Sequence, residues 1–254
     1  MNNIIPVYKP LGLTSLQCIK LLMEKYPELK DKKATFAGRL DPMAEGVLLV
    51  LLDEARFKKE KYLNLNKVYE ADLLFGFRSD TYDLLGEIIK VKKSNIDQTS
   101  LSKYLGKLVG QFEQKLPPYS SFRIKGKSLF EWSREGKIDQ IDIPTKNREI
   151  YLSELLGFWT EERMDLYNKI SNRINLVDGD FRQKIILEKW KQFLLDGSNY
   201  KLQCASIRIN CSSGTYIRSI INDLGDFLNC GALSLRIKRI SVGEFNESEC
   251  VFLN

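Results

Sequence analysis

One aspartate is a candidate for covalent or acid–base chemistry. Asp41 lies in the run 38–46, between a glycine-containing approach and Pro42, whose ring fixes the backbone φ angle. The aliphatic run Val47 to Leu52 follows directly. A carboxylate on a stiff loop beside an apolar strand could act as a nucleophile or as a general acid or base. An Asp-Pro pair is also a common turn initiator, and for the dipeptide alone that is the more frequent meaning.

A second segment could bind an anion. Residues 211–218 run from the end of an expected strand through Gly214 into an expected helix that carries Arg218. The first turn of a helix, with hydroxyl side chains nearby, favours anions. Arg218 could hold a carboxylate or a phosphate through two parallel hydrogen bonds. Locally, a capped helix start with a solvent-facing arginine explains the same residues.

Two further segments carry aromatic groups. Tyr69 follows Lys67 at the start of an expected strand, where its ring could stack on a base with about 1–3 kcal/mol. The rigid loop Pro117 to Arg123 combines aromatic, hydroxyl and cationic side chains. A strand tyrosine and a structural connector are the simpler interpretations of these two segments.

Composition narrows the chemistry further. The 254 residues include no histidine, which excludes Ser-His-Asp triads, Cys-His pairs and HExxH metal sites. The 39 basic residues outnumber the 33 acidic ones, which suits a polyanion such as RNA but also many ordinary proteins. The five cysteines form no CxxC pair, so buried thiols in a reducing compartment are expected. The N-terminus lacks a signal-peptide pattern and no apolar run could span a bilayer, so we predict a cytoplasmic protein without membrane contact.

The elements that must position these residues predict an α+β fold. Helices are expected over 15–25, 53–63, 98–109, 128–134 and 215–228, and strands over 47–52, 68–77, 150–158, 202–211 and 232–245. Residues 87–91 are expected to form the hairpin partner of strand 68–77, and residues 33–46 a polar connection. Two amphipathic segments, 161–174 and 181–195, predict a helical hairpin inserted at 160–198. We therefore expect a single domain, 1–254, with one insertion.

In their order, six blocks of the chain resemble the TruB family of RNA pseudouridine synthases. They are Tyr8 to Ser15, Gly38 to Gly46, Lys67 to Tyr69 with Gly76 and Ser79 to Gly86, Pro117 to Gly126, Gly214 to Ser219 with Asp223 to Gly225, and Cys230 to Ala232 with Ile237 to Arg239. Ordered agreement over most of the chain outside the insertion is far more specific than any one block.

The resemblance implies a fold, a reaction and a set of residues. The family has a pseudouridine-synthase fold, with a mixed, largely antiparallel central sheet flanked by helices and loops. It breaks the N1–C1′ bond of a uridine, rotates the base and rejoins it through C5, without a metal or an organic cofactor. By resemblance Asp41 is the catalytic residue, and the substrate-binding residues are Tyr69, Asp83, Tyr216, Arg218 and Ile237. Candidate RNA contacts are Lys9, Phe36, Arg123, Lys238 and Arg239.

Three departures from the family pattern concern RNA recognition. Thr35-Phe36-Ala37-Gly38 stands where bacterial members have a histidine in Gly-His-Thr-Gly, so the hydrogen bonds of that imidazole are missing. The chain stops at Asn254, so we expect a member of the family without the C-terminal PUA domain that is common in it. The 160–198 insertion is absent from the usual bacterial pattern. One hypothesis is that the insertion partly replaces the missing RNA contacts through its basic and aromatic residues, which are Arg163, Arg173, Arg182, Lys184, Lys189, Trp190 and Lys191. A surface hairpin without that role is the alternative.

The sequence therefore predicts a monomeric tRNA pseudouridine synthase that acts on a uridine of the T stem-loop. A pseudouridine synthase with another RNA target is the alternative within the enzyme class. A non-catalytic RNA-binding or RNA-folding module on the same scaffold is the alternative outside it.

Overall fold

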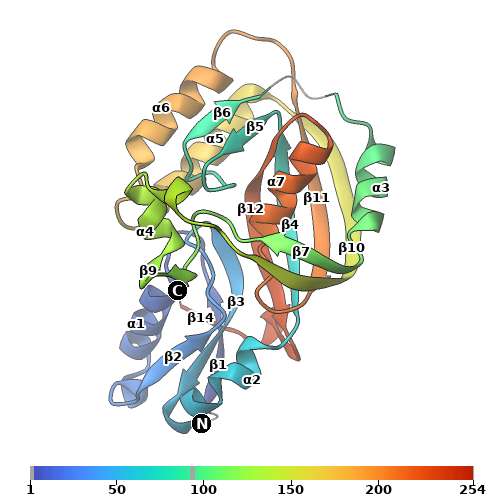
Figure 1. Ribbon diagram of the computed structural model, residues 1–254. Coiled ribbons are helices and arrows are strands. Elements are labelled where there is room, and N and C mark those ends of the chain that lie inside the picture. The colour runs from blue at the N-terminus through green and yellow to red at the C-terminus, as the bar shows by residue number, and fades with distance from the viewer. Residues whose placement is uncertain (1–2, 92–94, 254) are drawn as a thin grey trace.

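A ten-stranded sheet organises the computed structural model, which describes residues 3–91 and 95–253 (Figure 1). The strand order is β14-β1-β3-β12-β4-β11-β10-β7, with β2 beside β3 and β13 beside β12. The strands are β1 (Ile4–Lys9), β2 (Ala34–Ala37), β3 (Ala44–Leu52), β4 (Lys67–Phe75), β7 (Gly110–Lys115), β10 (Thr145–Glu161), β11 (Leu202–Cys211), β12 (Ala232–Val242), β13 (Phe245–Asn246) and β14 (Val251–Phe252). The β1–β14 and β3–β12 pairs are parallel and the other pairs antiparallel, which confirms the expected mixed, largely antiparallel sheet.

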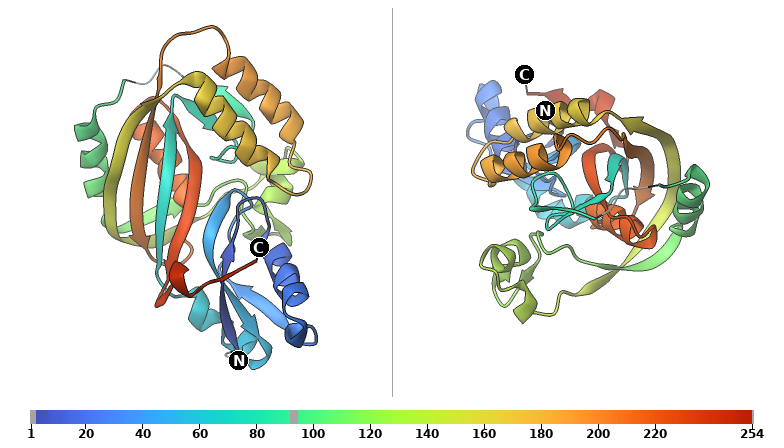
Figure 2. Two further views of the ribbon diagram at one scale, coloured as in Figure 1. Left: turned by 180° about the vertical axis from the view of Figure 1, so that it is seen from behind. Right: turned by 90° about the horizontal axis from the view of Figure 1, so that it is seen from above.

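Helices cover both faces of the sheet. They are α1 (Ser15–Lys25), α2 (Lys59–Leu63), α3 (Gln98–Lys107), α4 (Leu129–Arg134), α5 (Arg163–Asn175), α6 (Gln183–Leu194) and α7 (Ile217–Phe227). Neighbouring residues of a strand point to opposite faces. Leu73 packs in the core cluster that contains α3 and α7, whereas Leu74 packs in the cluster that contains α5 and α6. Figure 2 shows α5 and α6 on the side of the sheet opposite to α7. Among the described residues, no helix is long and apolar enough to cross a membrane.

Two small sheets and four short 3-10 turns complete the described fold. The sheets pair β5 (Phe77–Ser79) with β6 (Ile88–Lys90) and β8 (Arg123–Ile124) with β9 (Lys127–Ser128). The turns are Pro27–Leu29, Asp53–Lys58, Ile138–Gln140 and Glu247–Glu249. The expected hairpin between strand 68–77 and residues 87–91 is confirmed only at its end, where Phe77 in β5 pairs with Lys90 in β6. The long expected strand is interrupted at Gly76, and β4, which ends at Phe75, does not pair with β6. Strand β4 instead lies between β11 and β12.

The structure also corrects the expected connection over 33–46. Residues Ala34–Ala37 form β2, and β3 begins at Ala44, so only 38–43 is loop. Strands β1 and β7 were not predicted either. Strand β1 contains Pro6, which is unusual inside a strand. Strand β7 lies at the edge of the sheet, and its one buried residue is Gln114. Neither sequence therefore shows the alternation of apolar and polar residues that predicts a strand.

The expected helical hairpin lies between β10 and β11 as α5 and α6. Its inward side is part of a core cluster, with Leu166, Ile170, Ile174, Ile186 and Trp190 all buried. Trp190 is completely buried and its ring lies 5.3 Å from that of Phe77. The hairpin is therefore an integral layer over one face of the sheet and not a loosely attached decoration.

Candidate active site

The first turn of α7 presents Arg218 to the centre of the molecule. Gly214 has φ +78°, which gives the chain its sharp turn from β11 into the helix. Two hydrogen bonds from the buried Gln114 on β7 then fix the residue before the helix: the Tyr216 N–H donates to Oε1 at 2.8 Å, and Nε2 donates to the Tyr216 carbonyl at 3.0 Å. The position of Arg218 therefore depends on an edge strand distant in sequence.

The loop that carries Asp41 is held from the start of α1. The Ser15 hydroxyl donates to the Leu40 carbonyl at 3.2 Å, and the Leu40 N–H donates to Ser15 Oγ at 3.1 Å. The Gly12 N–H donates to the Pro42 carbonyl at 2.9 Å. Backbone bonds on both sides of Asp41 thus restrict where its carboxylate can lie.

Arg218 and Asp41 meet at the centre of the site. The Arg218 Nε donates to Asp41 Oδ2 at 2.9 Å and lies 3.7 Å from Asp83 Oδ2. Its two terminal nitrogens donate to backbone carbonyls, one to Thr81 and the other to Tyr119 at 3.1 Å. The Arg218 side chain is 5% exposed, whereas that of Asp41 is 38% exposed. The guanidinium is therefore covered on its far side, and the carboxylate it holds remains accessible.

The second carboxylate, Asp83, is enclosed. Its Oδ1 accepts hydrogen bonds from the Thr81 hydroxyl at 2.6 Å and from the Leu85 N–H at 3.0 Å. Burial raises the pKa of Asp83, although Arg218 and Thr81 act in the opposite direction. Burial alone would lower the pKa of Arg218, but the charges of Asp41 and Asp83 outweigh it and raise that pKa. The two carboxylates therefore keep the arginine cationic.

A small pocket opens beside the two carboxylates. Its lining consists of Asp41, Met43, Ala44, Asp83, Arg218, Ser234, Leu235, Arg236 and Ile237. Four apolar side chains thus lie next to four charged ones and a serine. Apolar walls beside a few polar groups are typical of binding sites for small molecules.

Two aromatic residues also lie within the electrostatic reach of Asp41. Burial raises the pKa of Tyr69, with Arg239 opposing and Asp41 adding to the shift. Burial likewise raises the pKa of Tyr216, and Asp41 adds to that shift. Both phenols therefore remain protonated near neutral pH, so their rings and hydroxyls act as neutral surfaces. Of the six residues expected at the catalytic and substrate-binding positions, Asp41, Asp83, Arg218 and Ile237 therefore line the pocket, and Tyr69 and Tyr216 lie close enough to Asp41 for its charge to raise their pKa values.

The five expected RNA contacts are in very different environments. Lys9 and Arg239 are 0% and 1% exposed, so the expected surface contact with a phosphate is not met. Lys9 Nζ donates to the Pro10 carbonyl at 2.8 Å. Arg239 donates to the carbonyls of Val47 at 2.7 Å and Gly38 at 3.0 Å, which ties the Asp41 loop to β3. Both cations therefore bind backbone carbonyls around the site.

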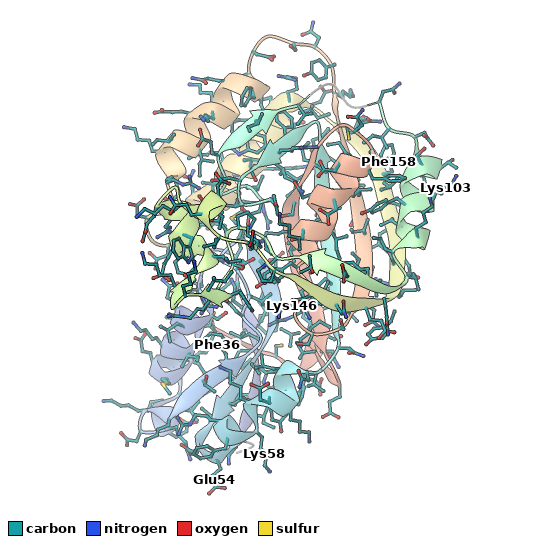
Figure 3. The ribbon with its side chains drawn as sticks, in the orientation of Figure 1. Phe36, Glu54, Lys58, Lys103, Lys146 and Phe158 are labelled. Atoms are coloured by element: carbon teal, nitrogen blue, oxygen red, sulfur yellow. The ribbon has the colours of Figure 1, made fainter. Side chains whose placement is uncertain are left out.

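The other three expected contacts are more accessible. Arg123 is exposed and donates to the Gly126 carbonyl at 2.7 Å. Lys238 is paired with Glu247 at 2.6 Å. Phe36, labelled in Figure 3 in the lower part of the molecule, lies beneath two cations: Arg39 is 5.9 Å and Lys59 5.6 Å from the centre of its ring.

Sequence reasoning missed the groups that complete the coordination of Arg218. The acceptors at Thr81 and Tyr119 are backbone carbonyls, which carry no side-chain signal. Gln114 could have been suspected because it precedes the Pro-Pro segment in the fourth matching block. Among residues 3–91 and 95–253, no group of three or more cysteine or acidic side chains is arranged to hold a metal ion.

Comparisons with known proteins agree with this geometry. The profile described as "TruB family pseudouridylate synthase (N terminal domain)" matches residues 27–174. The chain is 28% identical to a tRNA pseudouridine synthase B of Clostridium kluyveri, covering 100% of this chain and 71% of that protein. It is 30% identical to one of Aromatoleum aromaticum, covering 100% of this chain and 67% of that protein.

Solved structures show the same fold. A chain from "Crystal Structure of a Cbf5-Nop10-Gar1 Complex" superposes with a TM-score of 0.61 at 20% identity, over 98% of this chain and 52% of that one. A chain from "Structure of H/ACA RNP bound to a substrate RNA containing 2'-deoxyuridine" gives a TM-score of 0.59 at 19% identity, over 98% of this chain and 50% of that one. This chain thus spans about half the length of the chains in those two complexes.

Proposed function

The chain belongs to the TruB family of pseudouridylate synthases, and we propose that it isomerises a uridine in the T loop of tRNA to pseudouridine. The observation that carries the proposal is the Asp41–Arg218 pair at 2.9 Å, with an accessible carboxylate at the edge of a pocket. The relatives named tRNA pseudouridine synthase B support tRNA as the substrate. Choosing the T loop extends the resemblance seen in the sequence blocks.

The reaction exchanges one glycosidic bond for another. The N1–C1′ bond of the uridine breaks, the base rotates, and a C5–C1′ bond forms. The proton on C5 leaves to solvent and N1 gains a proton, so atoms and charge balance. Asp41 serves as the catalytic group, by attacking the ribose, by attacking the base or by abstracting a ribose proton. Each of these roles needs a carboxylate that is oriented and accessible, and Arg218 provides the orientation.

The neighbouring residues take part in binding the base. The uridine must leave the RNA stack before Asp41 can reach it, so its base is flipped into the pocket. We assign Tyr69 as the ring that stacks on the base, and Ile237 and Tyr216 as further walls of the pocket. Asp83 is the second carboxylate beside Arg218, with its Oδ2 atom 3.7 Å from the Arg218 Nε atom. We infer that the described residues form a single catalytic domain, which binds the RNA at its surface.

Tritium release from a tRNA transcript labelled at uridine C5 tests this function. Pseudouridine formation leaves the mass unchanged but releases the C5 tritium to water. Wild type is expected to release it, and Asp41→Asn is expected to release none above background. A transcript with cytidine in place of the T-loop uridine should abolish release by wild type.

The other outcomes identify the alternatives. Release that survives the cytidine change places the target elsewhere in the RNA, a result that Phe36 in place of the family histidine would favour. No release by wild type, with tRNA binding intact, contradicts the enzymatic proposal and favours a non-catalytic RNA-binding module.

A further inference from the structure

We propose that the loop between α5 and α6, residues 176–182, positions the Asp41–Arg218 pair, with Arg182 as the positioning residue. This inference rests on the proposed function. The loop, called the bracing loop below, belongs to the inserted hairpin and contacts three chain segments that build the site. Its contacts are with Gly12, which is hydrogen-bonded to the Asp41 loop, and with the segments that supply both carbonyl acceptors of Arg218.

The first contact leads to Asp41. The Asp178 N–H donates to the Gly12 carbonyl at 3.2 Å, and the Gly12 N–H donates to the Pro42 carbonyl at 2.9 Å. Gly12 has φ +95°, and a Cβ there would lie 1.9 Å from the Leu176 carbonyl oxygen. The backbone of the bracing loop therefore touches Gly12 so closely that no side chain fits between them. Two successive hydrogen bonds connect the loop with the residue that follows Asp41.

The second contact leads to Arg218. A terminal nitrogen of Arg182 lies 3.2 Å from Asp80 Oδ2, and its guanidinium carbon lies 5.6 Å from the centre of the Tyr119 ring. Asp80 is the neighbour of Thr81, and the Thr81 and Tyr119 carbonyls both accept hydrogen bonds from Arg218. One side chain thus connects the two segments whose carbonyls orient Arg218. Arg182 adopts φ +66°, which is costly for a residue with a side chain.

The hairpin gives the bracing loop a fixed base. Helices α5 and α6 are packed into the core through completely or almost completely buried side chains such as Ile170 and Trp190. In the same hairpin, the buried Arg163 donates to the Leu194 carbonyl and to Asp196, which joins the beginning of α5 to the end of α6. Because its two helices are packed on the sheet, the bracing loop is fixed relative to the sheet and can hold the site residues that it contacts in place.

The charges of the hairpin argue against an RNA-binding role. Residues 160–198 include seven basic and seven acidic side chains, so they offer no net attraction to a polyanion. Two of the residues in the RNA hypothesis, Arg163 and Trp190, are 6% and 0% exposed. Lys189 is paired with Glu87, and Arg182 with Asp80. Positioning accounts for these contacts, whereas phosphate binding would have to break them.

The test separates the chemical step from RNA binding. Single-turnover tritium release with enzyme in excess gives the rate constant of the bound complex, and filter binding gives the Kd for tRNA. For Arg182→Ala we expect a rate constant about tenfold lower, because the acceptors of Arg218 shift, and a Kd within about twofold of wild type. Arg182→Lys keeps the charge opposite Asp80 and should recover part of the rate.

Lys169→Ala is the matched control. It removes another ion pair between the hairpin and the sheet, with Glu161. Glu161 lies at the end of β10 and pairs with β11, not with the segments of Thr81 and Tyr119. The rate constant of this variant should equal that of wild type. A weakened Kd with an unchanged rate constant for Arg182→Ala, an equal loss in Lys169→Ala, or no loss in either variant would each overturn the proposal.

A readout independent of activity keeps this inference apart from the proposed function. Hydrogen–deuterium exchange in Arg182→Ala should accelerate in peptides that cover 80–87 and 117–122 and stay unchanged in β11. Should wild type prove inactive on every tRNA while this pattern appears, the bracing role stands and the assigned reaction falls. Unchanged exchange in those peptides contradicts the bracing role even if wild type is active.

Discussion

Arg218 at the candidate site and Arg163 in the inserted hairpin are two buried arginines with matching sets of partners. Each donates to one carboxylate and to two backbone carbonyls: Arg218 to Asp41, Thr81 and Tyr119, and Arg163 to Asp196, Leu194 and Phe193. Their side chains are 5% and 7% exposed. Burial and pairing alone would therefore give both arginines the same importance.

The two arginines differ in what their partners do. The partners of Arg163 lie 30 to 33 residues away and close the two ends of one hairpin. Those of Arg218 lie 99 to 177 residues away, on separate loops that converge on a pocket. A second carboxylate, Asp83, also lies 3.7 Å from Arg218. A buried ion pair thus indicates a reactive site only where distant segments converge on it and one charged partner stays accessible.

Arg218→Lys should have the largest effect on activity. A lysine keeps the positive charge but cannot donate to Asp41 and two carbonyls at once, since it lacks the planar fork of arginine. We expect the single-turnover rate constant to fall about 10²-fold or more, in the range typical of a lost charge-stabilising donor. The free energy of unfolding should fall as well, by about 2 kcal/mol as for Arg163→Lys below, because here too buried carbonyls lose their donor, so the rate constant is compared per folded molecule. A rate within about threefold of wild type would show that Arg218 is no more catalytic than Arg163.

Arg163→Lys is the reciprocal substitution in the hairpin. We expect a loss of about 2 kcal/mol in the free energy of unfolding, because buried carbonyls at the end of α6 lose their donor. Urea denaturation measures this loss. The rate constant per folded molecule should stay within about twofold of wild type. A large loss of activity without a loss of stability would contradict the structural role of Arg163.

The same contrast explains what could be predicted from the sequence. Helices α1, α3 and α7 and strand β11 match their predicted ranges closely, because apolar periodicity and caps mark them: at α1, Thr14 and Gln17 form a capping box. Strands β1, β2 and β7 were missed because they are short or polar and depend on neighbouring strands. Local pattern indicates an element only when the element buries a regular face.

For the site, the resemblance supplied the residues and the structure supplied their relations. Nothing in the sequence shows that Lys9 and Arg239, in blocks that suggested RNA contact, are buried and donate to carbonyls. Likewise the carbonyls of Thr81 and Tyr119 became visible only after folding, since any residue carries a carbonyl. Sequence reasoning therefore finds reactive side chains more readily than the backbone groups that orient them.

Asp83→Asn sharpens the comparison by removing the feature that Arg163 lacks. Asparagine keeps the shape and an acceptor for the Thr81 hydroxyl and the Leu85 N–H, but removes the second negative charge beside Arg218. We expect the single-turnover rate constant to fall about tenfold, equivalent to about 1.4 kcal/mol. Asp196→Asn serves as the control and should leave the rate unchanged. Equal rates in wild type and Asp83→Asn would restrict the electrostatic role to Asp41.

A third buried cation, Lys9, extends the comparison to a side chain that donates to a neutral carbonyl. Its Nζ donates to the Pro10 carbonyl, and burial lowers its pKa from 10.5 to about 8, with Cys18, Asp41 and Glu45 acting in the opposite direction. Between these two pH values the unfolded chain keeps the proton and the folded chain releases it. The unfolded state then binds more protons, so this group makes the folded protein more stable as pH rises from about 8 toward 10.5.

Comparison of wild type with Lys9→Met isolates that contribution, since other groups titrate similarly in both proteins. The free energy of unfolding is measured in urea for both proteins, at a pH near 7.5 and again near 9.5. The value for wild type minus that for Lys9→Met should rise by about 1–2 kcal/mol from the lower to the higher pH. Methionine matches the length of the buried stem and carries no charge, so the variant should show no such gain. A difference between the two proteins that is independent of pH would mean that Lys9 stays charged, and that proximity to Asp41 and Glu45 outweighs burial. Lys9 would then be electrostatically coupled to the site, as Arg218 is, and not an isolated structural cation.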